Sequence, residues 1–420
     1  MNIGIFGATG SFDFGDYAMM IHNIQQLYAL NQTHSFTIFS INKSVTQETL
    51  SQNIQDTKLL KKIRIVDDNL FEEAGIDNSF FSKLVRGLNY RILKRDIIEK
   101  RYLKFYDNLK PMSHKSEFSK ALAAVDLCLF NGGGYLQHSW KYHNIRFMIE
   151  IRLAKMMQIP VVFLANSVGP MKLYDRFTRE TLPLVDSIMV RDGREFSWKV
   201  LDDYGVLQKL NGPDDLFNAC DLYCLESTDS DDFVIIEIMA WIQRAPKGEK
   251  YIISVLAGFI DYLTIEENKK IRLINFDKWD TVAKESIREL FSIVKHPEMM
   301  EAMYEIESMY QVFEWYKRCS FSLSFKYHPV ILALGAGKPC AAVIADNDGY
   351  YLSKLKGAFM NCNMNAEEHV IHISELTISS AKELYLKTKE SICSSKTKDN
   401  LHQIRNDYLI SISNGAFIRS

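Results

Sequence analysis

The chain has 420 residues, of which 47% are hydrophobic and 24% charged, with a formal net charge of -2. This is the profile of a soluble globular protein of two or three domains, and the sparse Gly and Pro argue against long disordered linkers. The near-neutral charge disfavours a general nucleic-acid-binding surface, and no apolar run approaches the roughly 18 residues of a membrane-spanning helix.

Seven scattered cysteines, an odd number, are typical of reduced thiols in a cytoplasmic protein. The N-terminal residues lack the basic and apolar regions of a signal peptide, and they predict a first strand instead. Cys220 and Cys224 are too isolated to form half of a zinc site. We therefore expect a cytoplasmic protein without a bound metal.

Short apolar runs alternate with amphipathic stretches along the first half of the chain. Strands are predicted at Ile3–Phe6, Phe36–Phe39, Ile63–Val66, Leu127–Phe130, Val161–Ala165 and Ile188–Val190. Helical periodicity covers Tyr17–Leu30 and Asn144–Met157. Such alternation predicts a parallel sheet covered on both faces, so residues 1–205 are interpreted as an N-terminal Rossmann-like domain.

The alternation resumes in the second half. Strands are predicted at Tyr251–Val255, Phe321–Ser324 and Ala341–Ile344, and helices at Thr281–Val294, Met309–Arg318 and Pro329–Ala336. The apolar run Asp232–Ile242 fits either a strand or a buried helix. Residues 206–380 are predicted as a C-terminal Rossmann-like domain and residues 381–420 as a helical segment. Two such sheets in tandem place a ligand-binding cleft between their carboxyl ends.

One segment, Lys83–Lys110, interleaves lysines and arginines with apolar residues. A basic amphipathic helix of this kind can lie on an anionic membrane surface, which would make the protein peripheral to the inner face of the membrane. The plainer interpretation is a solvated helix face that also covers the sheet. Both interpretations stay open.

Glycines follow the first predicted strand at Gly7, Gly10 and Gly15. They allow the backbone to turn tightly and to approach an anion at a helix N-terminus. A dinucleotide fingerprint needs another glycine where Phe12 and Asp13 stand, so NAD binding is disfavoured. Asp16 opens the next helix, where it serves as an N-cap, as a functional carboxylate, or as both.

A second glycine cluster, Gly132, Gly133 and Gly134, follows the strand Leu127–Phe130. Three glycines at the end of a buried strand are costly unless the backbone must approach another group closely. A tight turn would explain them, but their place at the carboxyl edge of the sheet favours a substrate-binding loop.

Two weaker signals follow the next predicted strands. The loop with Asn166, Ser167 and Gly169 offers amides and a hydroxyl for ligand oxygens. Arg191 ends the following strand, where it needs an anionic partner. Asp192 could be that partner, or Arg191 could clamp a carboxylate or phosphate of a ligand.

The last motif places Ser324, Lys326 and His328 where a strand ends and a helix begins at Pro329. His328 would face the cleft at the helix N-terminus, where the helix field disfavours imidazolium unless a bound anion restores it. A single histidine is more often structural than catalytic. The strand-end position and the cation two residues earlier favour catalysis here.

In this order, the motifs resemble those of the polysaccharide pyruvyltransferase family. The matching segments are Asp13–Ala18, Gly132–Leu136, Asn166–Pro170, Arg191-Asp192 with Ser197 and Gly205, either Asp215 or Asp221, and Ser324–His328 with Gly337–Pro339. The resemblance runs from residue 4 to about residue 345. Asp13 stands where the family has Asn, the Asn166–Pro170 element lacks its first Gly, and Pro329 follows His328 where the family has a small residue. The departure that matters most is Lys326, where the family usually has Arg. Lysine supplies the charge but not the planar two-pronged contact.

The resemblance implies an α/β fold of two Rossmann-like domains in a GT-B-like arrangement with an interdomain cleft. It implies transfer of a pyruvyl group from phosphoenolpyruvate to a sugar of a cell-surface polysaccharide (exopolysaccharide) or its precursor, forming a ketal. The acceptor would be a sugar, an oligosaccharide or a lipid-linked saccharide, and no cofactor besides the co-substrate is expected.

Within this mechanism, Arg191, Lys326 and Ser324 would bind the donor, assisted by amides of the glycine loops. Protonation of the methylene carbon of phosphoenolpyruvate requires a general acid, for which His328 is the candidate. Asp16 is the carboxylate best placed to polarise the sugar hydroxyl.

Other interpretations remain. The nearest is a GT-B glycosyltransferase using a nucleotide sugar, but such enzymes commonly place a Glu before the second-domain G-x-P turn, and the stretch from His328 to Pro339 has no acidic residue. Another is a non-catalytic relative with an altered donor site, which the lysine at position 326 motivates. A dehydrogenase is the weakest alternative.

Overall fold

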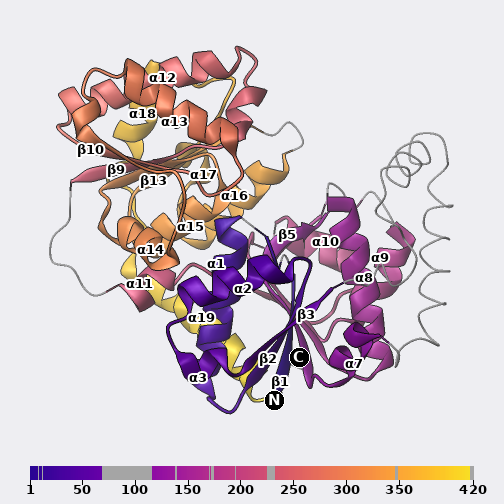
Figure 1. Ribbon diagram of the computed structural model, residues 1–420. Helices are drawn as coiled ribbons and strands as arrows, with labels where there is room; N and C mark the ends of the chain where they lie inside the picture. The colour runs from indigo at the N-terminus through magenta and orange to yellow at the C-terminus, as the bar shows by residue number, and fades with distance from the viewer. Residues whose placement is uncertain are drawn as a thin grey trace, which may run out of the picture.

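The computed structural model describes residues 1–7, 9–11, 13–68, 116–137, 140–169, 171, 175–193, 195–224, 232–345 and 349–416. The basic segment Lys83–Lys110 lies outside the described residues. The described chain forms two α/β units, each built on a parallel sheet with helices on both faces (Figure 1). The predicted fold class, two Rossmann-like domains in a GT-B-like arrangement, is confirmed.

In the described residues the first sheet has eight strands in the order β3-β2-β1-β4-β6-β7-β8, with β5 paired to β6. The strands are β1 (Asn2–Phe6), β2 (Ser35–Ser40), β3 (Ile63–Asp67), β4 (Leu127–Phe130), β5 (Gly133–Leu136), β6 (Val161–Val168), β7 (Ser187–Val190) and β8 (Lys209–Asn211). The central strands β1, β4 and β6 are almost wholly buried, because helices cover both faces of the sheet. This burial explains their continuous apolar runs.

Helices connect these strands. They are α1 (Phe14–Leu30), α2 (Lys43–Asn53), α3 (Thr57–Leu60), α7 (Glu117–Ala123), α8 (Lys141–Met156), α9 (Asp175–Thr181), the 3₁₀ turn Leu182–Leu184, α10 (Ser197–Asp203) and α11 (Ala219–Tyr223). The predicted helices Tyr17–Leu30 and Asn144–Met157 are confirmed as α1 and α8. The first sheet extends to Asn211, past the predicted limit at residue 205, because β8 pairs with β7.

The second sheet has six strands in the described residues, in the order β11-β10-β9-β12-β13-β14. They are β9 (Phe233–Glu237), β10 (Lys270–Ile274), β11 (Met300–Met303), β12 (Phe321–Ser324), β13 (Cys340–Ile344) and β14 (Val370–His372). The helical elements are the 3₁₀ turns Ala240–Arg244 and Pro297–Met299, α12 (Glu249–Ile265), α13 (Thr281–Ile293), α14 (Met309–Arg318), α15 (Tyr327–Gly335), α16 (Tyr350–Asn361), α17 (Ala366–His369), α18 (Ile378–Thr388) and α19 (Ser395–Ser413).

One predicted strand is wrong. Tyr251–Val255 lies inside α12, which begins after Gly248 and continues for 17 residues. The apolar character continues to Ile265 because this helix is buried along most of its length, so the short run resembled a strand. The ambiguous segment Asp232–Ile242 divides into β9 and the start of a 3₁₀ turn.

The C-terminal helical segment is shared between the two units. Helix α18 packs on α12 in the second unit, with the Tyr385 hydroxyl donating to Glu267. Helix α19 crosses back to the first unit, where the Tyr408 hydroxyl donates to the Phe163 carbonyl and Arg405 donates to Asn23. The segment predicted over residues 381–420 therefore ties the second unit to the first (Figure 1).

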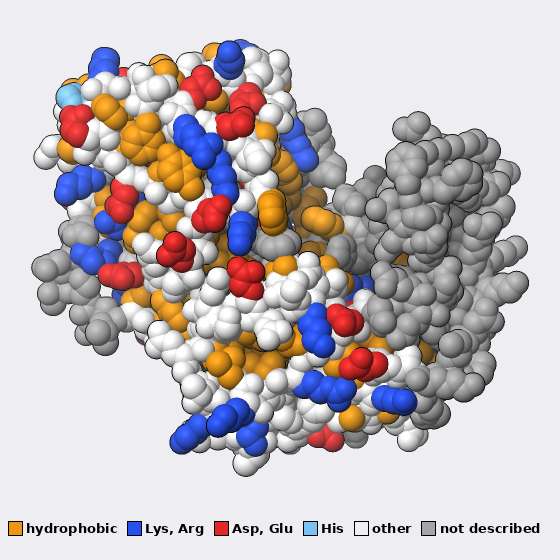
Figure 2. Space-filling model, in the orientation of Figure 1, with side chains coloured by type: hydrophobic (Ala, Val, Ile, Leu, Met, Phe, Trp, Pro, Cys, Tyr) orange, Lys and Arg blue, Asp and Glu red, His pale blue; other side chains and the backbone are white. Residues whose placement is uncertain are grey.

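The two units share a buried core, which fixes their relative position. One hydrophobic cluster contains Ile21 of α1, Val312 of α14, Leu332 of α15 and Leu409 of α19. On the face drawn in Figure 2, acidic and basic side chains are interspersed, in keeping with the net charge of -2. Among the helices of the described ranges, none combines the length and apolar character needed to cross a bilayer.

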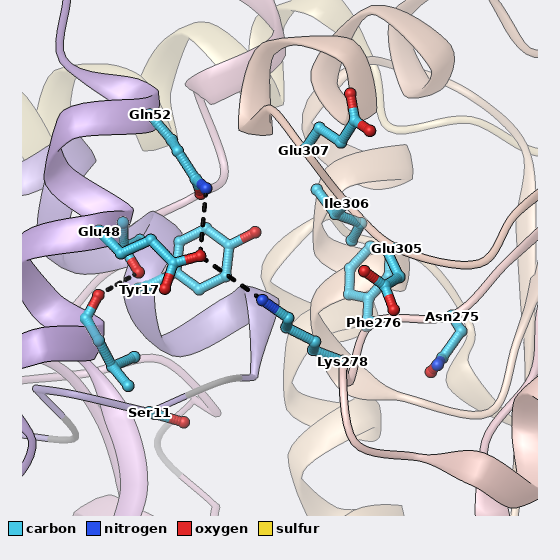
Figure 3. Close-up of a pocket in the computed structure, with 12 residues that line it drawn as sticks. Ser11, Tyr17, Glu48, Gln52, Asn275, Phe276, Lys278, Glu305, Ile306 and Glu307 are labelled. Atoms are coloured by element: carbon cyan, nitrogen blue, oxygen red, sulfur yellow. Dashed lines mark hydrogen bonds and ion pairs between the residues drawn. The ribbon is translucent and has the colours of Figure 1, made fainter.

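The units also meet through the loops at the carboxyl ends of their strands. The Phe14 amide donates to the Phe276 carbonyl at 2.9 Å, and Asp13 forms an antiparallel bridge with Asp277. Beside this contact lies a small hollow of about 110 Å³ between α2 and the loops after β10 and β11, where Lys278 reaches Glu48 at 3.6 Å (Figure 3).

Candidate active site

A larger cavity, of about 430 Å³, lies between the units at the carboxyl ends of both sheets. Its lining comes from both units and comprises Ser11, Asp13, Asp16, Ile41, Gly133, Gly134, Tyr135, Trp140, Arg191, Asp277, Trp279, Lys326, Tyr327, His328, Tyr350, Tyr351 and Lys354. Arg191, Lys326 and His328 meet at this one cavity, although they come from separate units. Parallel sheets bind ligands at this edge, where their loops converge.

His328 packs directly against the backbone of Gly15. It occupies the first turn of α15, and a Cβ at position 15 would lie 1.8 Å from its Nδ1 atom. Only glycine therefore leaves room for the ring. Burial lowers the pKa of His328 well below its ordinary value, and the charges of Arg191 and Lys354 lower it further. The imidazole is neutral in the unliganded protein.

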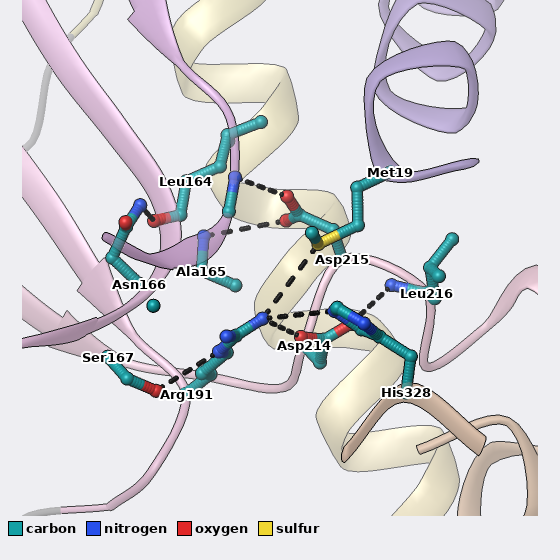
Figure 4. A network of polar contacts seen from close by, with 12 residues as sticks. Met19, Leu164, Ala165, Asn166, Ser167, Arg191, Asp214, Asp215, Leu216 and His328 are labelled. Atoms are coloured by element: carbon teal, nitrogen blue, oxygen red, sulfur yellow. Dashed lines mark hydrogen bonds and ion pairs between the residues drawn. The ribbon is translucent and has the colours of Figure 1, made fainter. Parts of the chain in front are cut away.

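Arg191 is held rigidly beside this imidazole. Its side chain is buried, with Nη1 2.6 Å from Asp214 Oδ2 and Nε donating to Ser167 Oγ at 3.1 Å (Figure 4). The same Nη1 lies 3.5 Å from His328 Nε2. Burial alone would lower the pKa of Arg191, but Tyr327 and Asp214 raise it overall, so the guanidinium stays charged.

Asp214, and not Asp192, is the carboxylate that pairs with Arg191. Asp192 instead accepts a hydrogen bond from Ser197 Oγ at 2.6 Å, and burial raises its pKa to about 6. The interpretation of Asp192 as the ion-pair partner is wrong because its side chain turns toward α10. A carboxylate from the loop after β8 takes that place.

Lys326 pairs with a carboxylate of the other unit. Its Nζ lies 2.5 Å from Asp13 Oδ2, while Asp13 Oδ1 accepts from the Gly15 amide and caps α1. Two of the residues expected to depart from the family pattern, Asp13 and Lys326, thus contact each other. Burial opposes the charge on Lys326, but Asp13 and Glu237 raise its pKa overall.

Glu237, at the end of β9, fixes the backbone that carries Lys326. Its Oε2 accepts from the amides of Phe325 and Lys326 at 2.8 and 2.9 Å. Burial raises the pKa of Glu237 to about 7. No sequence motif singled out Glu237, although a lone carboxylate in the apolar run from Phe233 to Ala240 could have pointed to it.

Lys354, which no motif indicated, reaches the cavity from α16. Its Nζ lies 4.3 to 4.9 Å from the ring centres of Tyr327, Tyr350 and Tyr351, and the residue is 5% exposed. No carboxylate of a described residue lies within ion-pair distance. Burial, and then the charge of Arg191, lowers the pKa of Lys354 to about 7. An anion entering the cavity would therefore meet a lysine that no carboxylate of the described residues neutralises.

Asp16 lies in the first turn of α1, and Asp13 takes the N-cap position instead. The Tyr135 hydroxyl donates to Asp16 Oδ1. Burial, and then the charge of Asp13, raises the pKa of Asp16 to about 7. A carboxylate that titrates near neutrality can take a proton from a hydroxyl group.

The other predicted binding residues divide into two groups. Gly133 and Gly134 line the cavity, where the Gly134 carbonyl accepts from the Tyr350 hydroxyl. The residues that do not line it are Gly10, Gly15, Gly132, Asn166, Ser167, Gly169 and Ser324.

These residues serve the protein itself, as Gly15 does by leaving room for His328. Ser167 holds Arg191, the Gly132 amide donates to Asp215, and Asn166 donates to the Leu164 carbonyl. The Ser324 hydroxyl contacts Ser322 and is fully buried. Gly10 and Gly169 have positive φ angles of 86° and 88°, so their role is to turn the backbone.

Comparisons with known proteins agree with this architecture. A solved UDP-GlcNAc 2-epimerase from Neisseria meningitidis, bound to UDP-GlcNAc, is 12% identical and superposes with a TM-score of 0.58, covering 99% of this chain and 100% of its own. The corresponding epimerase from Methanocaldococcus jannaschii is 11% identical with a TM-score of 0.54, covering 96% and 99%. At such identities the likeness concerns the fold alone. A search of curated proteins found no match.

The sequence itself decides the family. The family model described as polysaccharide pyruvyl transferase matches residues 13–347, a span that contains Asp13, Arg191, Lys326 and His328. That span covers most of the chain and both sides of the cavity. The chain belongs to the polysaccharide pyruvyl transferase family and is a transferase enzyme.

Proposed function

We propose that the chain transfers the pyruvyl group of phosphoenolpyruvate to two hydroxyls of one sugar, forming a cyclic ketal on a polysaccharide or its precursor. The observation that carries this proposal is the convergence of Arg191, Lys354 and His328 in one interdomain cavity. Phosphoenolpyruvate bears a carboxylate and a phosphate, and fixed cations in a buried cavity bind such groups strongly.

The donor's anionic groups are assigned to Arg191 and Lys354. The rings beside them keep both cations in place, because Arg191 and Lys354 each lie over the ring of Tyr327 at 4.5 and 4.7 Å. Lys326 adds positive potential, but its ammonium is already bound by Asp13. Its role toward the donor is therefore weaker than the sequence motif suggested.

His328 is assigned as the general acid. It is neutral without ligand, and a bound trianion would raise its pKa by offsetting Arg191 and Lys354. The imidazolium then gives its proton to the methylene carbon of the donor, which becomes a methyl group. The adjacent carbon becomes electrophilic and accepts a sugar hydroxyl oxygen, while Asp16 takes the hydroxyl proton.

The ketal closes in a second addition. The carbon–oxygen bond to phosphate breaks, and a second hydroxyl of the same sugar forms the remaining bond to the same carbon. The proton of that hydroxyl leaves with the phosphate, and the proton held by Asp16 returns to His328 through solvent. The balance is one phosphoenolpyruvate and one diol converted to one ketal and one inorganic phosphate.

The test is incubation with phosphoenolpyruvate and a saccharide panel, following phosphate release and a product mass gain equal to pyruvic acid less water. His328→Ala should abolish both signals while the circular dichroism spectrum is unchanged. His296→Ala is the matched control, because this histidine is exposed, pairs with Glu298 and does not line the cavity. Normal turnover in His328→Ala would remove His328 from the mechanism. A parallel incubation with nucleotide sugars that releases nucleotide, with no phosphate released from phosphoenolpyruvate, would replace the donor.

A further inference from the structure

We infer that the mouth of the cavity is the acceptor subsite, where a pyranose ring stacks on the indoles of Trp140 and Trp279. The identity of this ligand rests on the proposed function. The starting observation is exposure: Trp140 is 45% and Trp279 64% exposed, whereas Trp315 is 6% exposed. Both strongly exposed tryptophans of the described chain line the same cavity.

The two indoles reach the cavity from opposite units. Trp140 precedes α8 in the first unit, and its ring packs edge-on against Tyr135 with centroids 5.9 Å apart. Trp279 lies in the loop after β10 in the second unit, where its amide donates to Asp277 Oδ1 at 2.9 Å. Ile41, which is 45% exposed, adds a third apolar side chain to the lining.

Carboxylates accompany both indoles. Tyr135, which packs against Trp140, donates its hydroxyl to Asp16. Asp277, which holds the loop of Trp279, is bridged to Asp13. Through Tyr135 the aromatic surface of the mouth thus reaches Asp16, the carboxylate assigned to the sugar hydroxyl. Arg191 and Lys354 instead share the ring of Tyr327.

This combination fits a pyranose. A pyranose ring presents a face of C–H groups, which packs on an aromatic ring, and a rim of hydroxyls, which donate to carboxylates. A free phosphate or a carboxylic acid would gain nothing from two indoles beside Asp13 and Asp16. Exposed aromatic rings next to a few placed polar groups are typical of small-molecule sites.

The test uses methyl glucopyranoside, methyl galactopyranoside and methyl mannopyranoside as probes, because they carry no aromatic group of their own. Saturation-transfer difference NMR measures their binding, and calorimetry measures phosphoenolpyruvate binding to the same proteins. We expect Trp279→Ala and Trp140→Ala each to weaken glycoside binding by about tenfold, with phenylalanine at either position retaining most of it. Leu207→Ala, an exposed apolar residue elsewhere, should change nothing.

The measurements distinguish a failure of the acceptor subsite from a failure of the donor assignment. If the native protein binds phosphoenolpyruvate but binds none of the glycosides, or binds them equally well without either indole, the acceptor subsite is wrong and the donor assignment stands. If the native protein binds the glycosides through the indoles but does not bind phosphoenolpyruvate, the donor assignment is wrong.

Discussion

Asp13 and Lys326 join the N-termini of two helices, one from each unit, across the cavity. Asp13 caps α1 through one carboxylate oxygen and binds Lys326 Nζ through the other, and Lys326 occupies the N-cap position of α15. This ion pair joins the two positions at which the sequence was expected to depart from the family pattern, and both residues line the cavity together with Arg191 and His328.

Asp13→Asn should tighten phosphoenolpyruvate binding several-fold. The change removes a negative charge beside the donor and frees the ammonium of Lys326, while asparagine still caps α1. Calorimetric titration at low and high salt checks this, and the gain should shrink at high salt because part of it is electrostatic.

A double-mutant cycle with Lys326→Arg isolates the coupling. Lys326→Arg should improve donor binding more in the Asp13→Asn protein than in the native protein, because in the native protein Asp13 pairs with the new arginine. Strictly additive effects on the dissociation constant would show that the two positions act independently.

Gly15→Ala should destabilise the protein and impair turnover through His328. The new Cβ would lie 1.8 Å from the imidazole, and overpacking of this kind costs about 1–3 kcal/mol. Urea denaturation and phosphate-release kinetics measure the two effects.

The control for this prediction is the same substitution in a His328→Ala protein, where the space above Gly15 is open. There the alanine should cost much less stability. An equal cost in both backgrounds would show that glycine serves the helix backbone and not the histidine.

Much of the first sheet could be predicted because buried parallel strands are continuous apolar runs, as in Val161–Val168. The same rule failed at Tyr251–Val255, where a helix is apolar over most of its surface. The convergence of Arg191 and His328 followed from strand-end positions. The pairing of Asp13 with Lys326, 313 residues apart, and the tyrosine surroundings of Lys354 depend on how the units pack, which local patterns do not encode.

Removing the Asp214 carboxylate should cost far more stability than removing that of Asp192. Asp214→Ala leaves the buried guanidinium of Arg191 unpaired, and breaking a buried ion pair typically costs about 3–5 kcal/mol. Asp192→Ala loses mainly the hydrogen bond from Ser197. Urea titrations of the two variants give the free energies of unfolding to be compared.

Repeating Asp214→Ala in an Arg191→Ala protein completes this test. In this protein Asp214→Ala should lower the free energy of unfolding much less, because removing the carboxylate then leaves no charge unpaired. If Asp192→Ala proves the more damaging change, the structural assignment of the pair is contradicted.

Donor binding should weaken as the pH rises above 7, and Lys354 should be the main cause. The pKa of Lys354 is lowered to about 7, so the unliganded protein loses this positive charge as the pH rises through that value. The donor phosphate is already fully ionised there, because its second pKa is about 6. Lys354 alone should therefore make the association constant fall by up to about tenfold per pH unit above 7.

Lys354→Gln should bind the donor more weakly than the native protein at pH 6.5, approach it at about pH 9, and show a much flatter profile between these values. Lys356→Gln is the matched control, since Lys356 lies on the same helix but is partly exposed and pairs with Glu367. Its profile should follow that of the native protein. The neutral His328 also gains a proton when the donor binds, so the association constant of Lys354→Gln should keep a weaker dependence on pH. This remaining dependence should vanish in Lys354→Gln/His328→Gln. If Lys354→Gln shows the same pH dependence as the native protein, Lys354 is not a donor cation.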